Sequence, residues 1–583
     1  MGGLIDRKAL VVKNPFGDGG VFFGIDFAVI FKNKASIMKI KKTSHLNRFA
    51  SSRDNTCEES LRLMDRGDHE GALAGLEAVL AKTPGDLEAG LNKGLCLAAM
   101  GQLEQAARHL QSVHESAPSD PLILKVCAQV HGHANYFDMA LKFWSRYAKA
   151  KPEDYDAWAG MAYVSLRLGD DISSLMYATQ ALSLDPQNSH AYNNLGTALL
   201  GMDRLDDAEQ AFQTALALEP GNFNGLTNLA LLCFLRGNYK EAVHEYESIL
   251  PSVNPESVAF CELLYRSSFA YLGTGQLREG WRRYENGLQL KDSSARWPQP
   301  KLTAPRWTGE PLGDKRLLVW GEQGLGDELQ FYGLLNELKG MCQNITVECD
   351  PRLVSLLMRS LPDITVRAQN RNSFVLAQDC YAHIPAGSLA GIFRNQIEDF
   401  KKQRPYIKPN PKLEQDFSDR LKPYADKKLV GLSWRSGSVN ARRVKHYMRL
   451  EEISEILSNP DYAFVNLQYG DCEQELLNAE AALGIKIVRW HDVDLKDDQE
   501  AVAALIGQLD VVLSPLSAVG QMTMAVGVAL IAFGQPLWMS LGQEHYPWSK
   551  NVELITPIAG QELSTIVPRI VASLERSGSK DGA

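Results

Sequence analysis

The stretch that decides the fold of the first half runs from Pro186 to Pro220 and reads PQNSHAYNNLGTALLGMDRLDDAEQAFQTALALEP. Its two prolines lie 34 residues apart, and the same interval recurs along the chain in prolines, small residues and turn-forming residues. The prolines are Pro84, Pro118, Pro152, Pro186 and Pro220; the small residues are Ala72, Ala106, Ala140, Ser174, Ala208 and Ala242; the turn residues are Gly67, Gly101, Asn135, Gly169, Asp203 and Gly237. Three ladders with one period predict a repeat protein.

The unit itself resembles the tetratricopeptide repeat (TPR), a helix-turn-helix motif with Gly at the turn, Ala where the helices cross and Pro at the end. Each unit of such an array buries its apolar face only against its neighbours, which predicts a superhelix with a concave surface suited to binding polypeptide. We expect the repeats over residues 56–290, with the last unit displaced by an insertion near Ser252 to Ser257.

One inner-face position of the repeats carries Asn92, Val126, Gly160, Asn194 and Asn228, so asparagine occupies three of five repeats. An Asn side chain both donates and accepts hydrogen bonds, so a row of them can hold a peptide by its backbone. In the TPR domains of protein O-glycosyltransferases, which this array resembles, asparagines at this position line the groove. The resemblance implies that these three residues bind a protein acceptor. In the alternative interpretation they are solvated polar residues of the helices.

Composition restricts the possible function classes. The chain has 583 residues, enough for several folding units, and a net charge of -9, which argues against a nucleic-acid binder. No apolar run reaches the roughly 18 residues of a membrane-spanning helix. The nine cysteines form no CxxC pair, so we expect reduced thiols, no metal site and a cytoplasmic location.

Residues 1–55 are basic and follow neither the repeat pattern nor a signal-peptide pattern. We expect a disordered tail. The alternative is that translation starts at Met38 and the upstream residues are a misassigned start. A second short tail is expected at residues 576–583.

The pattern changes after a Pro- and Trp-rich linker at residues 291–311. Short apolar runs typical of buried strands then alternate with helical stretches. The expected strands are Arg316 to Trp320, Ile345 to Glu348, Leu429 to Ser433, Phe464 to Gln468, Val511 to Ser514 and Leu530 to Phe533. This alternation predicts parallel sheets in two Rossmann-like domains, at residues 312–410 and 411–575. The expected fold class is therefore an α solenoid followed by an α/β region.

A glycine-rich turn, Gly321 to Asp327, follows the first expected strand and opens a helix. Such a turn allows backbone to approach a ligand closely. It matches neither a dinucleotide-binding nor a Walker motif, so NAD and ATP are not indicated. Asp327 is alternatively only a helix cap.

Several motifs together resemble bacterial TPR proteins that carry a C-terminal glycosyltransferase domain of the GT-B fold. They are Gly280 to Glu285, Pro305 to Leu312, Trp320 to Glu328, Gly431 to Gly437, Lys445 to Tyr447, Phe464 to Asp471, Ser514 to Thr523 and Trp538 to Trp548. The turn that ends in Asp327 is similar to that of the lipopolysaccharide heptosyltransferases. The last motif looks most like flagellin glycosyltransferases.

This resemblance implies a metal-independent protein O-glycosyltransferase that uses a nucleotide sugar and acts on Ser or Thr. It assigns Asp327 as the general base. The donor-binding residues that it implies are Ser433, Arg435, Lys445, Gln468, Ser514, Ser517 and Ala518. The flagellin branch implies flagellin as the acceptor and a CMP-linked nonulosonic acid as the donor, and UDP- and ADP-sugars stay open.

Two further interpretations belong beside this one. The chain departs from the heptosyltransferase pattern at Ser514 to Ser517 and at Gln521, where that family has an Asp-Thr pair and a His. The rival function is therefore a catalytically inactive TPR scaffold or assembly protein with a degenerate GT-B domain.

The pair Asp492 and Asp494 resembles a metal-binding DxD motif. It lies just before Asp498, the expected cap of the helix from Gln499, and this place favours a loop.

Overall fold

The computed structural model describes residues 55–290, 296, 302–370, 378–436, 446–535, 538–558 and 561–577. This described chain divides between Leu229 and Ala230 into two compact units. We call residues 55–229 the repeat unit and residues 230–577 the C-terminal unit. The tail predicted at residues 1–55, the alternative start at Met38 and all but the first two residues of the tail predicted at 576–583 lie outside the described residues or at their edge.

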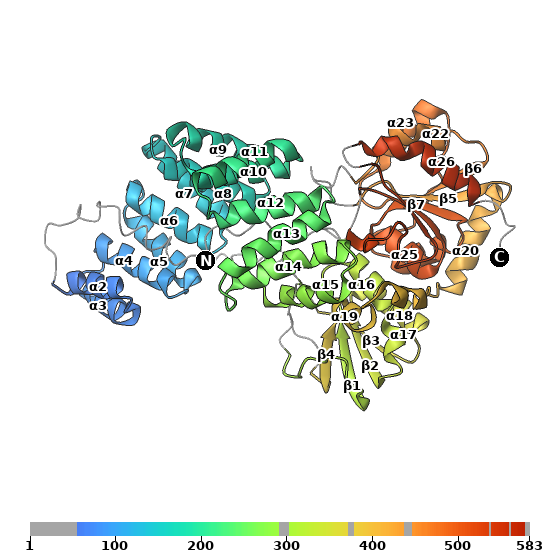
Figure 1. Ribbon diagram of the computed structural model, residues 1–583, viewed down its shortest axis with the longest axis horizontal. Coiled ribbons are helices and arrows are strands. Elements are labelled where there is room, and N and C mark those ends of the chain that lie inside the picture. The colour runs from blue at the N-terminus through green and yellow to red at the C-terminus, as the bar shows by residue number, and fades with distance from the viewer. Residues whose placement is uncertain are drawn as a thin grey trace, which may run out of the picture. The chain divides into compact units, whose positions relative to one another are not determined.

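The region before the first strand consists of paired antiparallel helices, as the 34-residue period predicts (Figure 1). The pairs are α2 (Asn55–Arg66) with α3 (His69–Lys82), α4 (Leu87–Ala99) with α5 (Leu103–Ser116), α6 (Pro121–His133) with α7 (Phe137–Ala150), α8 (Tyr155–Leu168) with α9 (Asp171–Leu184), α10 (Ser189–Gly201) with α11 (Leu205–Leu218), α12 (Phe223–Leu235) with α13 (Tyr239–Ile249), and α14 (Val258–Gly273) with α15 (Leu277–Tyr284). The predicted TPR solenoid is confirmed.

The turn ladder has a direct structural reason. Every predicted turn residue has a positive φ, including the two that are not glycine, Asn135 (63°) and Asp203 (60°). Asn and Asp are the residues that adopt this left-handed conformation most readily after Gly. The small residues of the second ladder, Ala72 to Ala242, are all fully buried, which lets the paired helices approach closely.

The boundary between the compact units falls inside α12, upstream of residue 290, where the sequence predicts the end of the repeats. Helices α14 and α15 therefore belong to the same compact unit as the two sheets. An aromatic cluster explains this assignment: Trp281 of α15 contacts the rings of Trp538 and Trp548, and Phe269 of α14 also contacts Trp538. The last helix pair is packed into the core that follows it.

The first sheet has four parallel strands in the order β3-β2-β1-β4. Its elements are β1 (Gly313–Trp320), α16 (Leu325–Tyr332), α17 (Leu335–Leu338), β2 (Cys342–Cys349), α18 (Val354–Ser360), β3 (Thr365–Ala368), β4 (Ala382–Pro385) and α19 (Leu389–Phe393). The central strand β1 ends in four buried residues. Strands β2 and β3 follow on one side of β1, and the chain then crosses to place β4 on the other side, so the winding of the sheet switches between β1 and β4.

The second sheet has five parallel strands in the order β6-β5-β7-β8-β9. Its elements are α20 (Pro411–Leu421), β5 (Lys428–Leu432), α22 (Ser454–Leu457), β6 (Tyr462–Asn466), α23 (Glu473–Leu483), α24 (Gln499–Ile506), β7 (Val511–Pro515), α25 (Ala518–Val526), β8 (Ala529–Phe533), β9 (Val552–Ile555) and α26 (Val567–Arg576). Here the order reverses between β5 and β7. The predicted α/β region with two Rossmann-like sheets is confirmed.

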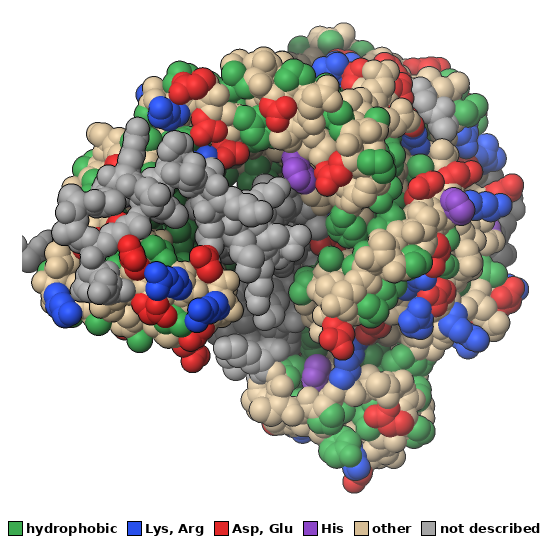
Figure 2. All heavy atoms as spheres, turned by 60° about the vertical axis from the view of Figure 1, so that its left-hand side comes forward, with side chains coloured by type: hydrophobic (Ala, Val, Ile, Leu, Met, Phe, Trp, Pro, Cys, Tyr) green, Lys and Arg blue, Asp and Glu red, His purple; other side chains and the backbone are tan. Residues whose placement is uncertain are grey.

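Acidic and basic side chains are interspersed over the face in Figure 2, in keeping with a charged fraction of 22%. Within the described ranges, no helix combines the length and the apolar character needed to cross a membrane.

Candidate functional site

Most of the sequence-predicted residues that the structure describes in the C-terminal unit lie at the carboxyl ends of central strands, and Gln468 follows the edge strand β6. The turn Gly321 to Gly324 follows β1, Ser433 and Arg435 follow β5, and Ser514 to Ser517 span the end of β7. These strands border the points where each sheet reverses its strand order. Open parallel sheets bind ligands at the carboxyl ends of strands beside such points.

The turn after β1 is built to be tight. Gln323 has a φ of 62°, which is uncommon for a residue other than glycine. A Cβ on Gly321 would lie 2.3 Å from Oε1 of Glu328 and 2.8 Å from the Tyr332 hydroxyl, so a larger residue here would displace these two buried side chains. The turn leads directly into α16 at Leu325.

Asp327 lies in the first turn of α16 and is 4% exposed. Its Oδ2 accepts a hydrogen bond from the Gly324 amide at 3.1 Å, so the carboxylate does cap the helix, as the alternative interpretation holds. Burial is the main cause that raises the pKa of Asp327, to about 7, and the nearby carboxylates of Glu322 and Glu328 add to the shift. A carboxyl group that titrates near neutral pH can exchange a proton at that pH.

The side chain of Gln468 binds the segment after β5 that contains the predicted donor-side residues. Its Oε1 accepts hydrogen bonds from the Ser433 hydroxyl at 3.2 Å, the Trp434 amide at 3.1 Å and the Arg435 amide at 3.0 Å. Both Gln468 and Ser433 are buried. The structure therefore brings Ser433, Arg435 and Gln468 together, and Gln468 shapes the loop.

The Arg435 side chain is already paired. Its Nε donates to Oε1 of Glu475 at 3.1 Å, and another guanidinium nitrogen donates to the Asp471 carbonyl at 2.7 Å. The hydrogen bonds to Glu475 raise the pKa of Arg435. To contact a phosphate directly, this guanidinium would have to share or leave Glu475.

Ser514, Ser517 and Ala518 lie where β7 meets α25. The Ser514 hydroxyl donates to the Pro515 carbonyl at 2.8 Å. Ser517 occupies the N-cap position of α25, yet its side chain makes no capping hydrogen bond. The first amides of a helix without a side-chain cap favour an anion. Lys445, the remaining donor-side prediction, lies outside the described residues.

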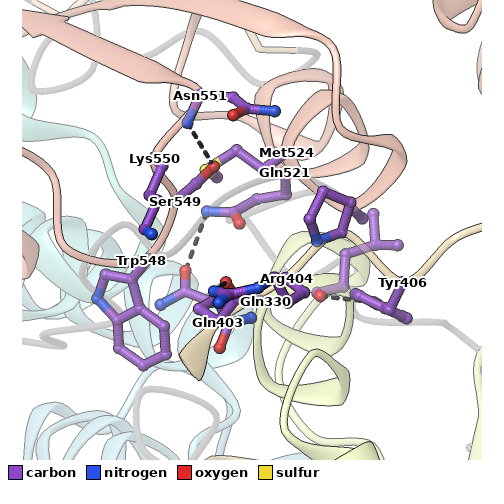
Figure 3. A pocket seen from close by; sticks show the side chains of 13 residues that line it. Gln330, Gln403, Arg404, Tyr406, Gln521, Met524, Trp548, Ser549, Lys550 and Asn551 are labelled. Carbon is purple, nitrogen blue, oxygen red and sulfur yellow. Dashed lines mark hydrogen bonds between the residues drawn. The ribbon is translucent and has the colours of Figure 1, made fainter. Parts of the chain in front are cut away.

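Helices α16 and α25 pack against each other and join the two sheet regions. Across this contact the Gln521 Nε2 donates to Oε1 of Gln330 at 3.0 Å, and both side chains are buried (Figure 3). A cavity of about 230 Å³ lies beside this pair, lined also by Gln403, Tyr406 and Trp548. Its lining includes neither Asp327 nor the donor-side residues, so the cavity is distinct from the predicted site.

The three predicted acceptor-binding asparagines are buried, at 2%, 4% and 7% exposure for Asn92, Asn194 and Asn228. The interpretation that they are solvated is therefore wrong. Close packing is the reason: Nδ2 of Asn228 donates to Oδ1 of Asn193 at 2.9 Å in the preceding repeat, and that of Asn92 donates to the Glu88 carbonyl. Oδ1 of Asn194 has no hydrogen-bond partner in the described part of the chain.

The acidic pair that resembles a DxD motif is used in contacts of its own loop. Oδ1 of Asp494 accepts hydrogen bonds from the amides of Lys496 and Asp497, and Asp492 pairs with Arg420. Asp498 caps α24 through the Ala501 amide at 3.0 Å, as predicted. Within the described ranges no three His, Cys, Asp or Glu side chains gather to hold a metal ion.

Two family models for the tetratricopeptide repeat match the chain, at residues 63–130 and 193–255. Among curated proteins, the chain is 28% identical over 434 residues to Protein FlbA of Caulobacter vibrioides, an alignment that covers 72% of each chain. That alignment is longer than everything before β1, so it includes part of the sheet region. A TPR repeat-containing protein of Pseudomonas aeruginosa is 34% identical over 87 residues, 15% of this chain and 36% of its own.

Among solved structures, a tetratricopeptide repeat protein from Parabacteroides merdae covers 41% of this chain and 93% of its own, with a TM-score of 0.37 and 16% identity. A structure titled MamA from Desulfovibrio magneticus covers 29% and 99%, with a TM-score of 0.28 and 20% identity.

Proposed function

We propose that the protein is a glycosyltransferase that moves a sugar from a nucleotide donor to a Ser or Thr hydroxyl of a protein bound by its repeats. One observation carries this proposal. A buried carboxylate with a pKa near neutrality and a helix N-terminus free of a side-chain cap lie at the switch points of two sheets whose helices α16 and α25 are in contact. The resemblance to GT-B enzymes and the alignment with Protein FlbA support it.

The proposed reaction divides between the two sheets. The acceptor hydroxyl oxygen forms a bond to the anomeric carbon as the bond from that carbon to the donor phosphate oxygen breaks. Asp327 on the first sheet takes the hydroxyl proton, and the nucleotide leaves with the electron pair of the broken bond. The amides at the start of α25, with Ser514 and Ser517, stabilise the phosphate. Lys445 adds a positive charge in the same proposal.

The substrates of the proposal follow the resemblance. Flagellin is the acceptor that we propose, and a CMP-linked nonulosonic acid is the donor, transferred without a bound metal or other cofactor. We place the reaction in the cytoplasm, which all nine cysteines, free in the structure, support because disulfides persist in oxidising compartments.

A second candidate is the inactive scaffold, favoured by the pairing of Arg435 with Glu475. The two candidates differ in nucleotide binding. If the protein is an enzyme, one of CMP, UDP, GDP and ADP will raise the melting temperature of the C-terminal unit. A ligand at 100 times its Kd adds about 2.7 kcal/mol to the free energy of unfolding. If none of the four nucleotides raises the melting temperature, the result supports the scaffold.

A matched pair of variants at the start of α25 locates this binding. We expect Ser517→Asp to lose most of the nucleotide response, because a carboxylate at the N-cap occupies the helix amides and repels the phosphate. Ser517→Asn has nearly the same shape without the charge and will keep more of the response. Equal responses from the two variants would place the phosphate elsewhere.

The repeat unit offers a separate test of acceptor binding. Asn194→Ala is expected to weaken flagellin binding by about 2- to 10-fold, the effect of one lost hydrogen bond. The variant breaks no internal hydrogen bond at Oδ1, because that atom has no partner in the described chain. Gln213→Ala, on the exposed side of α11, is the control. Titration calorimetry measures the affinity of both variants for flagellin. Equal affinities for Asn194→Ala and the control would remove Asn194 from the acceptor site.

A further inference from the structure

Arg296 lies in the stretch that the sequence indicates as a linker, yet its side chain is fully buried. Nε donates to Oε2 of Glu322 at 2.8 Å, and a second nitrogen donates to Oε1 of Glu285 at 2.8 Å. The remaining nitrogen donates to Oε1 of Glu322 at 2.5 Å and to the Ser388 hydroxyl at 2.7 Å. A guanidinium with this many partners is a fixed part of the core.

Glu322 is the second residue of the turn after β1 and is 1% exposed. Besides Arg296, its carboxylate accepts the Gly387 amide at 2.9 Å. A Cβ on Gly387 would lie 2.6 Å from Oε1 of Glu322, so the approach is close. A buried carboxylate is tolerated only with such partners, and Arg296 supplies the charge that balances it.

The same guanidinium reaches the end of the repeats. Glu285 begins the short helix η4 (Glu285–Gln289) directly after α15, and it pairs with Arg296, with Arg306 and with the Ser388 hydroxyl. The guanidinium also lies 4.3 Å from the ring centroid of Tyr284. The end of the last repeat helix and the turn before Asp327 therefore share one arginine.

A second contact joins the same two segments. The Tyr284 hydroxyl donates to Oε1 of Gln323 at 3.4 Å, and Gln323 is the turn residue with positive φ. A residue persists in that backbone conformation only where its surroundings fix it. The contacts of Glu322 and Gln323 provide this fixing.

We propose that Arg296 is a positioning residue for the transfer reaction, because its ion pairs to Glu322 and Glu285 hold the turn before Asp327 against the last repeat helix and neutralise the Glu322 carboxylate within that turn. This inference rests on the proposed function, in which Asp327 is the base. It also makes the end of the solenoid part of the acceptor side of the active site.

The charges around Asp327 allow the inference to be tested by titration. The charged and titratable groups near it are Glu322 and Glu328, Tyr284 at the end of α15, and Arg296 itself. Helix α25 and η6 (Ala386–Ser388), which pack on α16, contain no titratable residue. Tyr406 also contacts α16, where its hydroxyl donates to the Leu329 carbonyl at 2.6 Å. Arg296 is the cation hydrogen-bonded to Glu322, and Arg306 is a second positive charge near that carboxylate. The loss of Arg296 will therefore make proton release from Asp327 harder.

The experiment compares Arg296→Met with Arg296→Lys. We expect Arg296→Met to slow transfer by about 10- to 100-fold, because the base is misplaced, and to move the acid limb of the rate profile up by about one pH unit. Arg296→Lys keeps the charge, so the acid limb of its rate profile will lie at the wild-type pH, while its rate will stay below the wild-type rate. Nucleotide binding by the second sheet will be unchanged. A folded Arg296→Met variant with the wild-type rate and limb would overturn the proposal.

A double variant covers the case in which Arg296→Met does not fold. Arg296→Met with Glu322→Gln removes both buried charges, so it leaves no unpaired ion and is expected to fold. The reference is Glu322→Gln alone, measured at a pH above the acid limb. If Arg296 only stabilises the fold, the double variant will transfer at the rate of this reference; if Arg296 positions the turn, the double variant will be slower than the reference.

A readout that needs no substrate separates this inference from the proposed function. The pKa of Asp327 can be measured as the pH dependence of the stability difference between each protein and its Asp327→Asn form. A higher midpoint in the Arg296→Met background supports the inference even if no transfer is seen, and an unchanged midpoint contradicts it. Absence of transfer by the wild-type protein would contradict the proposed function alone.

Discussion

Asp327→Asn is expected to lower sugar transfer by roughly 100-fold or more and, at the same time, to make the protein more stable above pH 7. The first effect is the loss of a general base, since an amide cannot take the acceptor proton. Nucleotide binding should survive, because the phosphate contacts belong to the other sheet. The wild-type rate should rise with pH through about 7, as Asp327 loses its proton.

The stability effect follows from burial. The pKa of Asp327 rises from the ordinary 3.8 to about 7 on folding, so its contribution to stability is fully present below pH 3.8 and is lost as pH rises through 7. The difference of about three units corresponds to at most about 4 kcal/mol. Asn carries no charge at any pH and can still accept the Gly324 hydrogen bond.

Melting temperatures of both proteins between pH 5 and 9 check this prediction. The control is Asp379→Asn, because the hydrogen bond from Arg367 lowers the pKa of that carboxyl to about 2. Its stabilising effect is present above the ordinary pKa, so this variant should be less stable than wild type at neutral pH, the opposite sign. An Asp327→Asn protein that is destabilised at pH 8 would mean that Asp327 has a structural role as an anion.

Trp281→Ala is expected to destabilise the C-terminal unit by about 3 to 5 kcal/mol, the usual cost of removing a buried tryptophan. Trp281 is 2% exposed, and its Nε1 donates to the Arg394 carbonyl at 2.9 Å. Its ring lies 6.4 Å from that of Trp538 and 6.3 Å from that of Trp548. The loss therefore breaks the packing between α15 and both sheet regions.

Urea unfolding measures this loss. Trp281→Phe keeps an aromatic ring and loses the hydrogen bond, so it should cost clearly less than the alanine variant. Trp158→Ala, a half-buried tryptophan in the repeat unit, is the control for a change outside the C-terminal unit. A cost below about 1 kcal/mol for Trp281→Ala would show that α15 is not part of that core.

Much of the fold was predictable because periodic features report local geometry. The ladder from Gly67 to Gly237 marks positions that need a left-handed turn, and each has one. The six strands predicted from apolar runs match β1, β2, β5, β6, β7 and β8. The missed strands β3, β4 and β9 have four residues each and lie at sheet edges, where partly exposed side chains leave no continuous apolar run.

The candidate site was predictable only in part. Asp327 and Ser517 follow buried strands, and strand order then places them at the switch points. The burial of Arg296 was missed, since its partners Glu285, Glu322 and Ser388 lie 11, 26 and 92 residues away in the sequence. Glu322, a charge directly after an apolar strand, was the available signal, because a buried carboxylate requires a cation. The burial of Asn228 depends on its contact with Asn193 one repeat away, which a single position cannot reveal.

The most direct test of the proposed glycosyltransferase activity is the intact mass of flagellin after incubation with the purified protein and a nucleotide sugar. We predict a mass gain equal to one or more transferred sugars with CMP-linked nonulosonic acid, and no such gain over the same time with the Asp327→Asn protein. Equal gains with both proteins would contradict the assignment of the base. No gain with any donor, from a protein that binds nucleotide, would contradict transfer to flagellin itself.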